Sequence, residues 1–467
     1  MIFRRMLVGT PRVASQEIRE RLIGGPIIRT MLSLSLPPTA STLVQLFVAL
    51  AQVHYVGHLG IEPLAALTLV APLVLAMQLL SAADVGGAIS AATARARGAN
   101  ETDDLQRLVL YAVACSLFLG LLFATIEYLG GRALYRLLGG NGRVLEEAVS
   151  YGRIVFCGGV LMWMTNLLAA TLRGRGETFA PSVIIMASSL ATFPLYPMLT
   201  LGAFGEPGLG LAGAAIAFVA GYAASTIALL VYMQRMGRGT RIALVDRWWC
   251  WKLVRETARV ALLSSTRTVL SIGASLAATY CVGRLGDVAI AGYGIASRLD
   301  LTFISLLYGL GISILAMVGA NLGARNAERS YRVSVAGTLL ATAIGGALGL
   351  LVAIRPDLWL VHFSDDAAVL LEGERYLRIV GLAYALGAGG SALLFVGQAR
   401  GQMRWTFWGT AGRFAIVAVC ATGLLGFPDT MDSIALMMAS AYAVQGIVAA
   451  AILNPVNWRI AAKGQMA

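Results

Sequence analysis

The sequence is divided into long apolar stretches, and their length restricts the fold more than any other feature. Each stretch holds about 20 mostly apolar residues, the length that an α-helix needs to cross a lipid bilayer. Only helices explain such runs, because every backbone polar group must be satisfied inside the lipid. We therefore predict an all-α membrane protein of about 12 transmembrane helices. The predicted spans lie near residues 31–56, 64–92, 108–130, 149–171, 180–202, 208–234, 260–283, 288–320, 334–354, 376–398, 406–427 and 432–453.

The overall composition is typical of an integral membrane protein. Hydrophobic residues make up 58% of the 467 residues, and charged residues make up 13%. A soluble domain carries about 25% charged residues, so a soluble chain of this composition would expose a very large apolar surface. The net charge of +12 is spread between the apolar stretches and does not form the clustered basic surface of a nucleic-acid site. We expect the bilayer as its surroundings and no nucleic-acid partner.

The placement of arginine and lysine predicts the orientation. With the N-terminus on the inner side, the inner segments hold 25 of the 36 basic residues and the outer segments hold 8. The positive-inside rule then predicts that both termini are cytoplasmic and that the chain lies in the inner (plasma) membrane. Residues 1–30 lack the short apolar core and cleavage site of a secretory signal. The predicted parts are a cytoplasmic N-terminal segment (1–30), an N-lobe of six spans (31–234), a cytoplasmic linker (235–259), a C-lobe of six spans (260–453) and a cytoplasmic tail (454–467).

The two predicted lobes contain matching segments that are 225 or 226 residues apart. Val56–Gly60 reads VGHLG and returns as VGRLG at Val282–Gly286, which is 226 residues later. Arg175-Gly176 returns as Arg400-Gly401, and Gly98-Ala99 returns as Gly323-Ala324, both 225 residues later. Each pair falls at the same place in a six-span half. Because six is even, both halves have the same orientation, and the sequence predicts two parallel lobes related by an internal repeat.

Motifs of soluble enzymes are missing from the sequence. There is no GxxxxGK[ST], HExxH, GxSxG or CxxC pattern, so direct use of ATP is not expected. The five cysteines are scattered, and His54, His58 and His362 have no neighbouring ligand cluster. We expect no metal and no cofactor apart from a coupling ion.

Several segments, in their order along both halves, resemble the multidrug and toxic compound extrusion (MATE) family. The resemblance covers about residues 30–455 and implies a twelve-helix, two-lobed exporter. It also implies that proton or sodium entry drives the export, often of amphipathic organic cations. The segments that carry it are Val56–Gly60, Arg97–Asn100, Leu172–Thr178 followed by Pro181, Gly208–Ala217, Tyr293–Asp300 and Val318–Ala324.

The chain departs from that family at the usual coupling acids. Members often carry an aspartate in the first span, where this chain has Gln52. In the fifth span many carry an asparagine and an aspartate before a proline, and alignment on Pro197 places Thr192 and Tyr196 there. The seventh and tenth spans, where some branches carry an acid, contain none.

Two acids remain as candidates for cation coupling. Only Asp84 and Asp300 lie well within predicted spans, and a charge there costs about 3 kcal/mol unless it is paired or lines a wet cavity. For Asp84 the alternative is a structural role: its carboxyl group either holds helices together by hydrogen bonds or reaches water in a vestibule. Asp300 lies where MATE members often carry an acid, and its alternative is a structural ion pair with Arg267 or Arg413.

Polar residues and prolines within the spans complete the candidate site. As substrate or cavity residues we predict Gln45, Gln52, Asn166, Tyr196, Arg298 and Gln398. An interhelical hydrogen bond is the alternative for Asn166 and Gln398. Pro194 and Pro197 are gating candidates in the fifth span, and a static kink is their alternative.

The leading hypothesis is a secondary active exporter of an organic solute. We expect the solute to be small and either amphipathic or cationic, the export to proceed by alternating access with H⁺ or Na⁺ entry, and the protein to work as a monomer. One alternative is a flippase for a lipid-linked or amphiphilic metabolite. Another is a polytopic membrane enzyme or a non-transporting sensor, although the sequence shows no cluster of polar catalytic groups at one membrane face.

Overall fold

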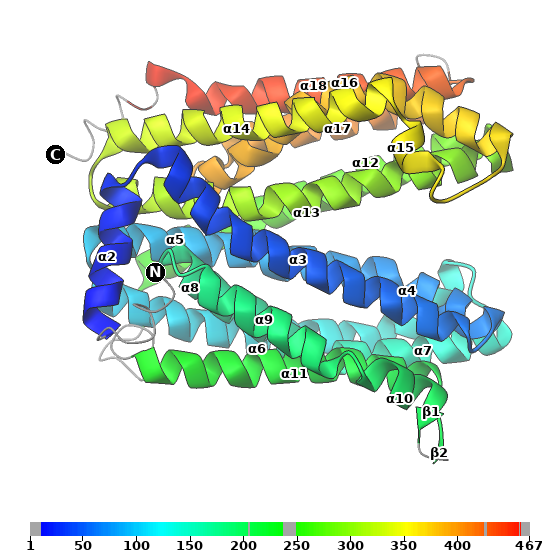
Figure 1. Ribbon diagram of the computed structural model, residues 1–467, viewed down its shortest axis with the longest axis horizontal. Helices are drawn as coiled ribbons and strands as arrows, with labels where there is room; N and C mark the ends of the chain where they lie inside the picture. The colour runs from blue at the N-terminus through cyan, green and yellow to red at the C-terminus, as the bar shows by residue number, and fades with distance from the viewer. Residues whose placement is uncertain (1–10, 204–205, 237–248, 425–426, 457, 459–467) are drawn as a thin grey trace. The chain divides into compact units, whose positions relative to one another are not determined.

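The computed structural model describes residues 11–203, 206–236, 249–424, 427–456 and 458. Nearly all of these residues are helical (Figure 1). The helices are α2 (Pro11–Gly24), α3 (Ile27–Gly57), α4 (Ile61–Leu79), η1 (Leu80–Val85), α5 (Gly86–Ala99), α6 (Thr102–Leu137), α7 (Gly142–Cys157), α8 (Gly159–Gly174), α9 (Phe179–Thr192), α10 (Leu195–Leu201), α11 (Leu211–Met236), α12 (Trp251–Gly283), α13 (Asp287–Gly323), α14 (Ala327–Ile354), α15 (Asp357–Leu360), α16 (Ala367–Arg400), α17 (Arg404–Thr422), α18 (Met431–Ala450) and η2 (Ala451–Leu453).

Each of the twelve predicted spans falls on helix in the described residues. Among these residues, ten helical segments are long and apolar enough to cross a membrane, and α7 with α8, bent by 41°, makes an eleventh. The remaining predicted span corresponds to α17, which has 19 residues. Two arginines, Arg404 and Arg413, lower the hydropathy of α17. The prediction of an all-α membrane protein is confirmed, with one small addition: a two-residue antiparallel ladder pairs β1 (Gly202–Ala203) with β2 (Glu206–Pro207).

The chain forms two compact units, which we call the first and the second unit. The first unit holds the described residues of 1–19 and 40–258, and the second holds those of 20–39 and 259–467. Residues 31–39, which the sequence analysis assigned to the N-lobe, therefore belong to the second unit. The side-chain amide of Asn321 donates to the backbone oxygen of Leu22 over 3.0 Å, and a Cβ on Gly309 would come within 2.5 Å of the Ser35 oxygen. These contacts fix the segment in the second unit.

The internal repeat is visible in the backbone. Left-handed residues are favoured where the chain turns sharply after a helix, and they occur here at repeat-related positions. The related pairs, with their φ angles, are Gly60 (114°) with Gly286 (103°), Asn100 (64°) with Arg325 (58°), and Gly176 (83°) with Gly401 (69°). The loops that leave corresponding helices therefore share one geometry, which confirms the predicted repeat.

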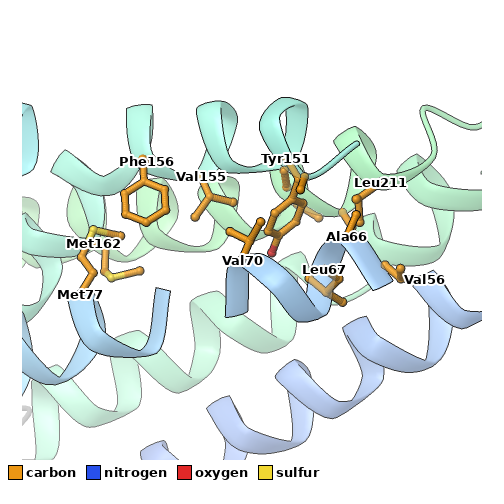
Figure 2. Close-up of a cluster of buried hydrophobic side chains, with 14 of the residues drawn as sticks. Val56, Ala66, Leu67, Val70, Met77, Tyr151, Val155, Phe156, Met162 and Leu211 are labelled. Carbon is orange, nitrogen blue, oxygen red and sulfur yellow. The ribbon is translucent and has the colours of Figure 1, made fainter. Parts of the chain in front are cut away.

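Each unit has its own apolar core. In the first unit, buried side chains from α3, α4, α7, α8 and α11 form one cluster, and Figure 2 shows Val70, Tyr151 and Phe156 within it. In the second unit, Tyr376, Val380, Ile434 and Met438 belong to a corresponding cluster. These cores hold the helices that carry the polar candidates.

Small residues bring neighbouring helices close together. In the first unit, a Cβ on Gly174 of α8 would come within 2.9 Å of Thr93 on α5. In the second unit, a Cβ on Gly381 of α16 would come within 2.6 Å of the Gly349 oxygen on α14, and α16 packs against both α14 and α18 (Figure 1). Close approach of this kind is typical of membrane helices, whose interfaces are enriched in small residues.

Candidate functional site

Asp84 lies on a turn of π-helix that interrupts the second span. This turn, η1, joins α4 to α5 and holds Ser81 and Asp84, both 0% exposed. Gly86 follows directly, and a Cβ there would come within 2.6 Å of the Ser81 oxygen. Single π-helical turns occur frequently at functional sites. The predicted coupling acid is thus buried in an irregular turn of the first unit.

Asn166 is hydrogen bonded to the same region of the second span. Its side-chain amide donates to Ser81 Oγ over 2.8 Å and to Gln78 Oε1 over 3.4 Å. Tyr222 on α11 donates to that Gln78 oxygen over 2.9 Å. We call Gln78, Ser81, Asn166 and Tyr222 the first polar cluster. It ties α8 and α11 to the segment that carries Asp84, three residues beyond Ser81.

The other polar candidates of the first unit have separate partners. Gln52 is 6% exposed and donates to the Tyr151 hydroxyl on α7 over 2.9 Å. Tyr196 is 3% exposed and belongs to the apolar core. Gln45 is half-buried and reaches back to Ser41 Oγ at 3.5 Å, one turn earlier on α3. Gln52 therefore makes an interhelical hydrogen bond between α3 and α7.

The fifth span is broken at the predicted prolines. α9 ends at Thr192, Pro194 lies at the N-cap of α10, and Pro197 lies within α10. Pro194 cannot donate a backbone hydrogen bond, and its ring clashes with the preceding turn, which accounts for the break. The interruption is a structural fact, whereas a gating role for these prolines remains a prediction.

Asp300 in the second unit accepts hydrogen bonds from two tyrosines. Tyr384 on α16 donates to Oδ1 over 2.5 Å, and Tyr442 on α18 donates to Oδ2 over 3.2 Å. The ring of Tyr384 is also stacked on Phe303, with centroids 5.3 Å apart. The carboxylate of α13 is therefore held by neutral donors from two other helices.

Arg413 approaches this acid from α17 but does not contact it. Its guanidinium carbon lies 4.4 Å from the centroid of the Tyr442 ring, and its Nη1 donates to Gln445 Oε1 over 3.2 Å. Tyr442 thus touches both Arg413 and Asp300. We call Asp300, Tyr384, Arg413, Tyr442 and Gln445 the second polar cluster. The sequence analysis proposed Arg267 or Arg413 as the partner of Asp300. The second polar cluster contains Arg413 and not Arg267.

Arg298 and Arg267 lie outside the second polar cluster. Arg298 is exposed, and its guanidinium carbon lies 5.9 Å from the Phe363 ring centroid. Arg267 is half-buried, and its Nη2 lies 3.5 Å from Thr268 Oγ1. The side chains of Arg298 and Asp300 therefore have different neighbours, as their separation of two residues on a helix predicts.

Gln398 is fully buried near the end of α16. Its amide nitrogen donates to Ser264 Oγ on α12 over 2.9 Å. The structure therefore joins Gln398 to a neighbouring span and does not bring it together with Asp300.

Glu127 is a buried acid that the sequence analysis did not select. It is 6% exposed on α6 and accepts a hydrogen bond from Tyr135 over 2.7 Å. Two glycines leave room for its carboxylate, because a Cβ on Gly131 would come within 2.6 Å of its carboxyl carbon and one on Gly152 within 2.5 Å of Oε1. The signal that could have found it is the spacing of Glu127, Gly131 and Tyr135, which places all three on one helix face.

A second buried acid, Glu177, lies in the loop between α8 and α9. Arg175 Nε approaches Glu177 Oε1 to 3.9 Å, and both side chains are 6% exposed. Burial raises the pKa of the Glu177 carboxyl, while the charges of Arg175 and Arg97 act in the opposite direction. Burial also lowers the pKa of Arg175. Burial therefore disfavours the charged forms of both Arg175 and Glu177 in this loop.

Possible metal ligands are dispersed over the described part of the chain. Within it, no three His, Cys, Asp or Glu side chains are close enough to share a metal ion. His54 and His58 lie 3.3 Å apart between their Nε2 atoms, one turn apart on α3.

The MatE family model matches the chain twice. One match covers residues 37–198 and the other covers residues 266–428. Each match lies within one of the two predicted lobes, 31–234 and 260–453, so the two halves are similar to one and the same family.

Curated relatives of similar length are named for multidrug resistance or for transport. The chain is 25% identical to a probable multidrug resistance protein, YoeA, of Bacillus subtilis, over 81% of this chain and 82% of the relative. It is 23% identical to a probable multidrug resistance protein, NorM, of Thermotoga maritima, over 80% and 78%. It is also 24% identical to a protein of Shewanella oneidensis named as an FAD transporter, over 78% and 81%.

Solved structures show the same fold. A crystal structure of MATE in the bent conformation superposes with a TM-score of 0.87 at 20% identity, covering 96% of this chain and 99% of the other. A MOP superfamily transporter from Pyrococcus furiosus gives a TM-score of 0.85 at 21% identity, covering 94% and 98%. Taken with the twofold family match, these likenesses mean that the chain belongs to the MATE family and is a multi-pass membrane transporter, a secondary exporter and not an enzyme.

Proposed function

We propose that this protein exports an amphipathic or cationic organic solute by alternating access, in exchange for H⁺ or Na⁺ entering the cell. The observation that carries the proposal is the geometry of Asp300. Its two oxygens accept from the hydroxyls of Tyr384 and Tyr442, and Arg413 contacts the Tyr442 ring instead of the acid. Asp300 is half-buried, and a carboxylate that is held by neutral donors retains the capacity to bind and release a cation, whereas a directly paired one is already neutralised.

Asp84 is the proposed coupling acid of the first unit. It is fully buried on the π-helical turn, next to the first polar cluster. The resemblance to the MATE family implies acids at the positions of Gln52 and Tyr196, and neither of these side chains ionises at neutral pH. Coupling in this chain would then depend on Asp84 and Asp300.

The solute class is inferred from the names of the relatives. Several relatives are named for multidrug resistance, and one is named as an FAD transporter. These names have in common that the solute is an organic molecule, and we propose that it is amphipathic or cationic. We propose that no cofactor other than the coupling ion is needed, that the monomer is sufficient, and that the protein lies in the inner membrane with both termini in the cytoplasm.

A flux measurement on the purified protein tests this proposal. The full chain would be reconstituted in vesicles loaded with a fluorescent pH indicator, and tetraphenylphosphonium would be added as the organic cation. We expect the cation to elicit proton movement in the opposite direction, or, in a parallel assay, movement of ²²Na⁺. Asp84→Asn should reduce the flux at least ten-fold, whereas Ser116→Ala, a change to another buried residue of the first unit, should leave it within two-fold.

The alternatives predict different results in the same assay. If the wild-type protein moves no ion in response to the cation but transfers a short-chain fluorescent lipid between leaflets, the flippase function replaces the one proposed. Full flux in Asp84→Asn would remove Asp84 from the mechanism and leave Asp300 to be tested separately.

A further inference from the structure

A groove in the second unit lies beside the end of α16 and the start of α17. It has a volume of about 640 Å³, within the range of small-molecule sites. Arg259 and Leu263 of α12 form one wall, and Arg404, Trp405 and Trp408 of α17 form another. The groove is therefore lined by two cations and two indole rings, and no acidic side chain is among its lining residues in the described part of the chain.

The two arginines are available to an external anion. Both side chains are exposed, and neither takes part in an ion pair among the described residues. Arg404 has a weak contact with the Trp405 ring, with 5.6 Å between the guanidinium carbon and the centroid. Trp408 is 56% exposed, so the apolar part of the groove is open as well.

The internal repeat supplies a comparison within the same molecule. α9 begins at Phe179 and α17 begins at Arg404, 225 residues later, after loops of the same geometry. At the positions of Arg404, Trp405 and Trp408 the first half has Phe179, Ala180 and Val183. The fold therefore does not require arginine or tryptophan here, and the second half carries both.

Arginine beside tryptophan at the end of a membrane helix matches the chemistry of a phospholipid surface. Indole rings favour the level of the headgroups, and guanidinium groups bind phosphate oxygens with paired donors. Basic grooves between membrane helices bind anionic headgroups, and the apolar wall would accept the first part of an acyl chain. We propose that this groove binds one anionic phospholipid, with Arg259 and Arg404 holding its phosphate and Trp405 and Trp408 contacting its glycerol and acyl region.

Quenching of tryptophan fluorescence tests the proposal directly. The purified full chain would be placed in phosphatidylcholine vesicles that contain 10 mol % (about one lipid in ten) of brominated phosphatidylglycerol or, in a matched sample, brominated phosphatidylcholine. We expect stronger quenching by the anionic lipid, and the excess should vanish in Trp405→Phe/Trp408→Phe. Each arginine near an anionic surface strengthens binding roughly five-fold, so Arg259→Gln/Arg404→Gln should weaken the preference roughly 25-fold.

A control variant separates this site from the general effect of charge. Arg136→Gln/Arg284→Gln removes the same charge from exposed arginines at the ends of α6 and α12, and it should keep the preference. The charge-preserving change at the groove, Arg259→Lys/Arg404→Lys, should keep most of it.

Three results would reject the proposal. Equal quenching of the wild-type protein by the two lipids rejects it without any variant, which covers the case in which Arg259→Gln/Arg404→Gln does not fold. An equal loss in the Arg136→Gln/Arg284→Gln control assigns the preference to net charge. Full displacement of the brominated lipid by inorganic phosphate at constant ionic strength assigns the groove to a soluble anion.

Discussion

The hydroxyl of Tyr442 lies 3.2 Å from Oδ2 of Asp300 and joins α18 to α13. The face of the same tyrosine ring receives Arg413 at 4.4 Å. One side chain thus connects an acid and a base that have no direct contact. Because a cation–π contact leaves the charge of the guanidinium in place, the acid experiences a positive charge without being bound to it.

The change Asp300→Asn should separate transport from folding. The asparagine side chain would keep an acceptor for one tyrosine but would lack the negative charge that binds a cation, so we expect ion-driven transport to fall at least ten-fold. The thermal midpoint should change little, because a neutral amide is cheaper to bury than a carboxylate. Vesicle flux and thermal unfolding of the same preparation measure both quantities. Unchanged flux would exclude Asp300 from ion coupling.

Tyr442→Phe should destabilise the second unit while keeping a ring beneath Arg413. The change removes one hydrogen bond to a charged acceptor, which contributes about 1.5–3 kcal/mol. Thermal or denaturant unfolding of the detergent-purified variant measures the loss. Tyr280→Phe removes the hydroxyl of a tyrosine on α12 that is 58% exposed, and this control should remain near the wild-type value. Equal midpoints for the two variants would mean that the bond to Asp300 adds nothing to stability.

Two neighbouring glycines of α6 should respond in opposite ways to the same substitution. Gly131→Ala would place a Cβ against the buried carboxylate of Glu127, and overpacking of this kind costs about 1–3 kcal/mol. At Gly130 no atom lies within 4 Å of the added Cβ, so Gly130→Ala should be neutral or stabilising by up to about 1 kcal/mol. Thermal unfolding midpoints of the two variants test this prediction, and equal midpoints would contradict it.

A double variant shows whether Glu127 is the cause. If it is, Gly131→Ala should cost much less in a Glu127→Ala background, where the carboxylate is absent. Equal costs in both backgrounds would mean that the glycine is needed for a different contact.

The buried Glu177 should make stability fall with increasing pH. Its pKa is raised above its ordinary value of 4.5 mainly by burial, so the folded protein holds the proton more tightly than the unfolded chain. The resulting stabilisation is complete below about pH 4.5 and is lost as pH rises through the raised pKa. Glu177→Gln should lack this contribution, and its midpoint should fall less than that of the wild type as the pH is raised from below 4.5 to neutral. Parallel pH profiles would show that Glu177 does not titrate differently on folding.

The spans and the repeat could be predicted because both can be read directly along the sequence. Apolar length is set by bilayer thickness, and the offset between Gly176 and Gly401 can be counted directly. The partner of Gln52 could not be predicted, because Tyr151 is 99 residues away on a different helix. The same limit applies to Asp300, whose donors Tyr384 and Tyr442 come from two later spans.

Glu127 was missed for a related reason. It lies near the end of a predicted span, where an acid is ordinarily exposed to water, and its burial depends on Gly152 of another helix. The assignment of residues 31–39 was missed because α3 is one uninterrupted helix from Ile27 to Gly57. A continuous helix gives no local sign that its first part packs with a distant half of the chain.

The membership of residues 20–39 in the second unit limits how this protein can be divided. A cut in the linker would give two fragments of six spans each, and the second fragment would lack the helical segment that covers Gly309 and accepts from Asn321. The two halves of the internal repeat are thus not interchangeable modules. The C-terminal half could be produced as a complete folding unit only together with a segment that the ribosome makes first.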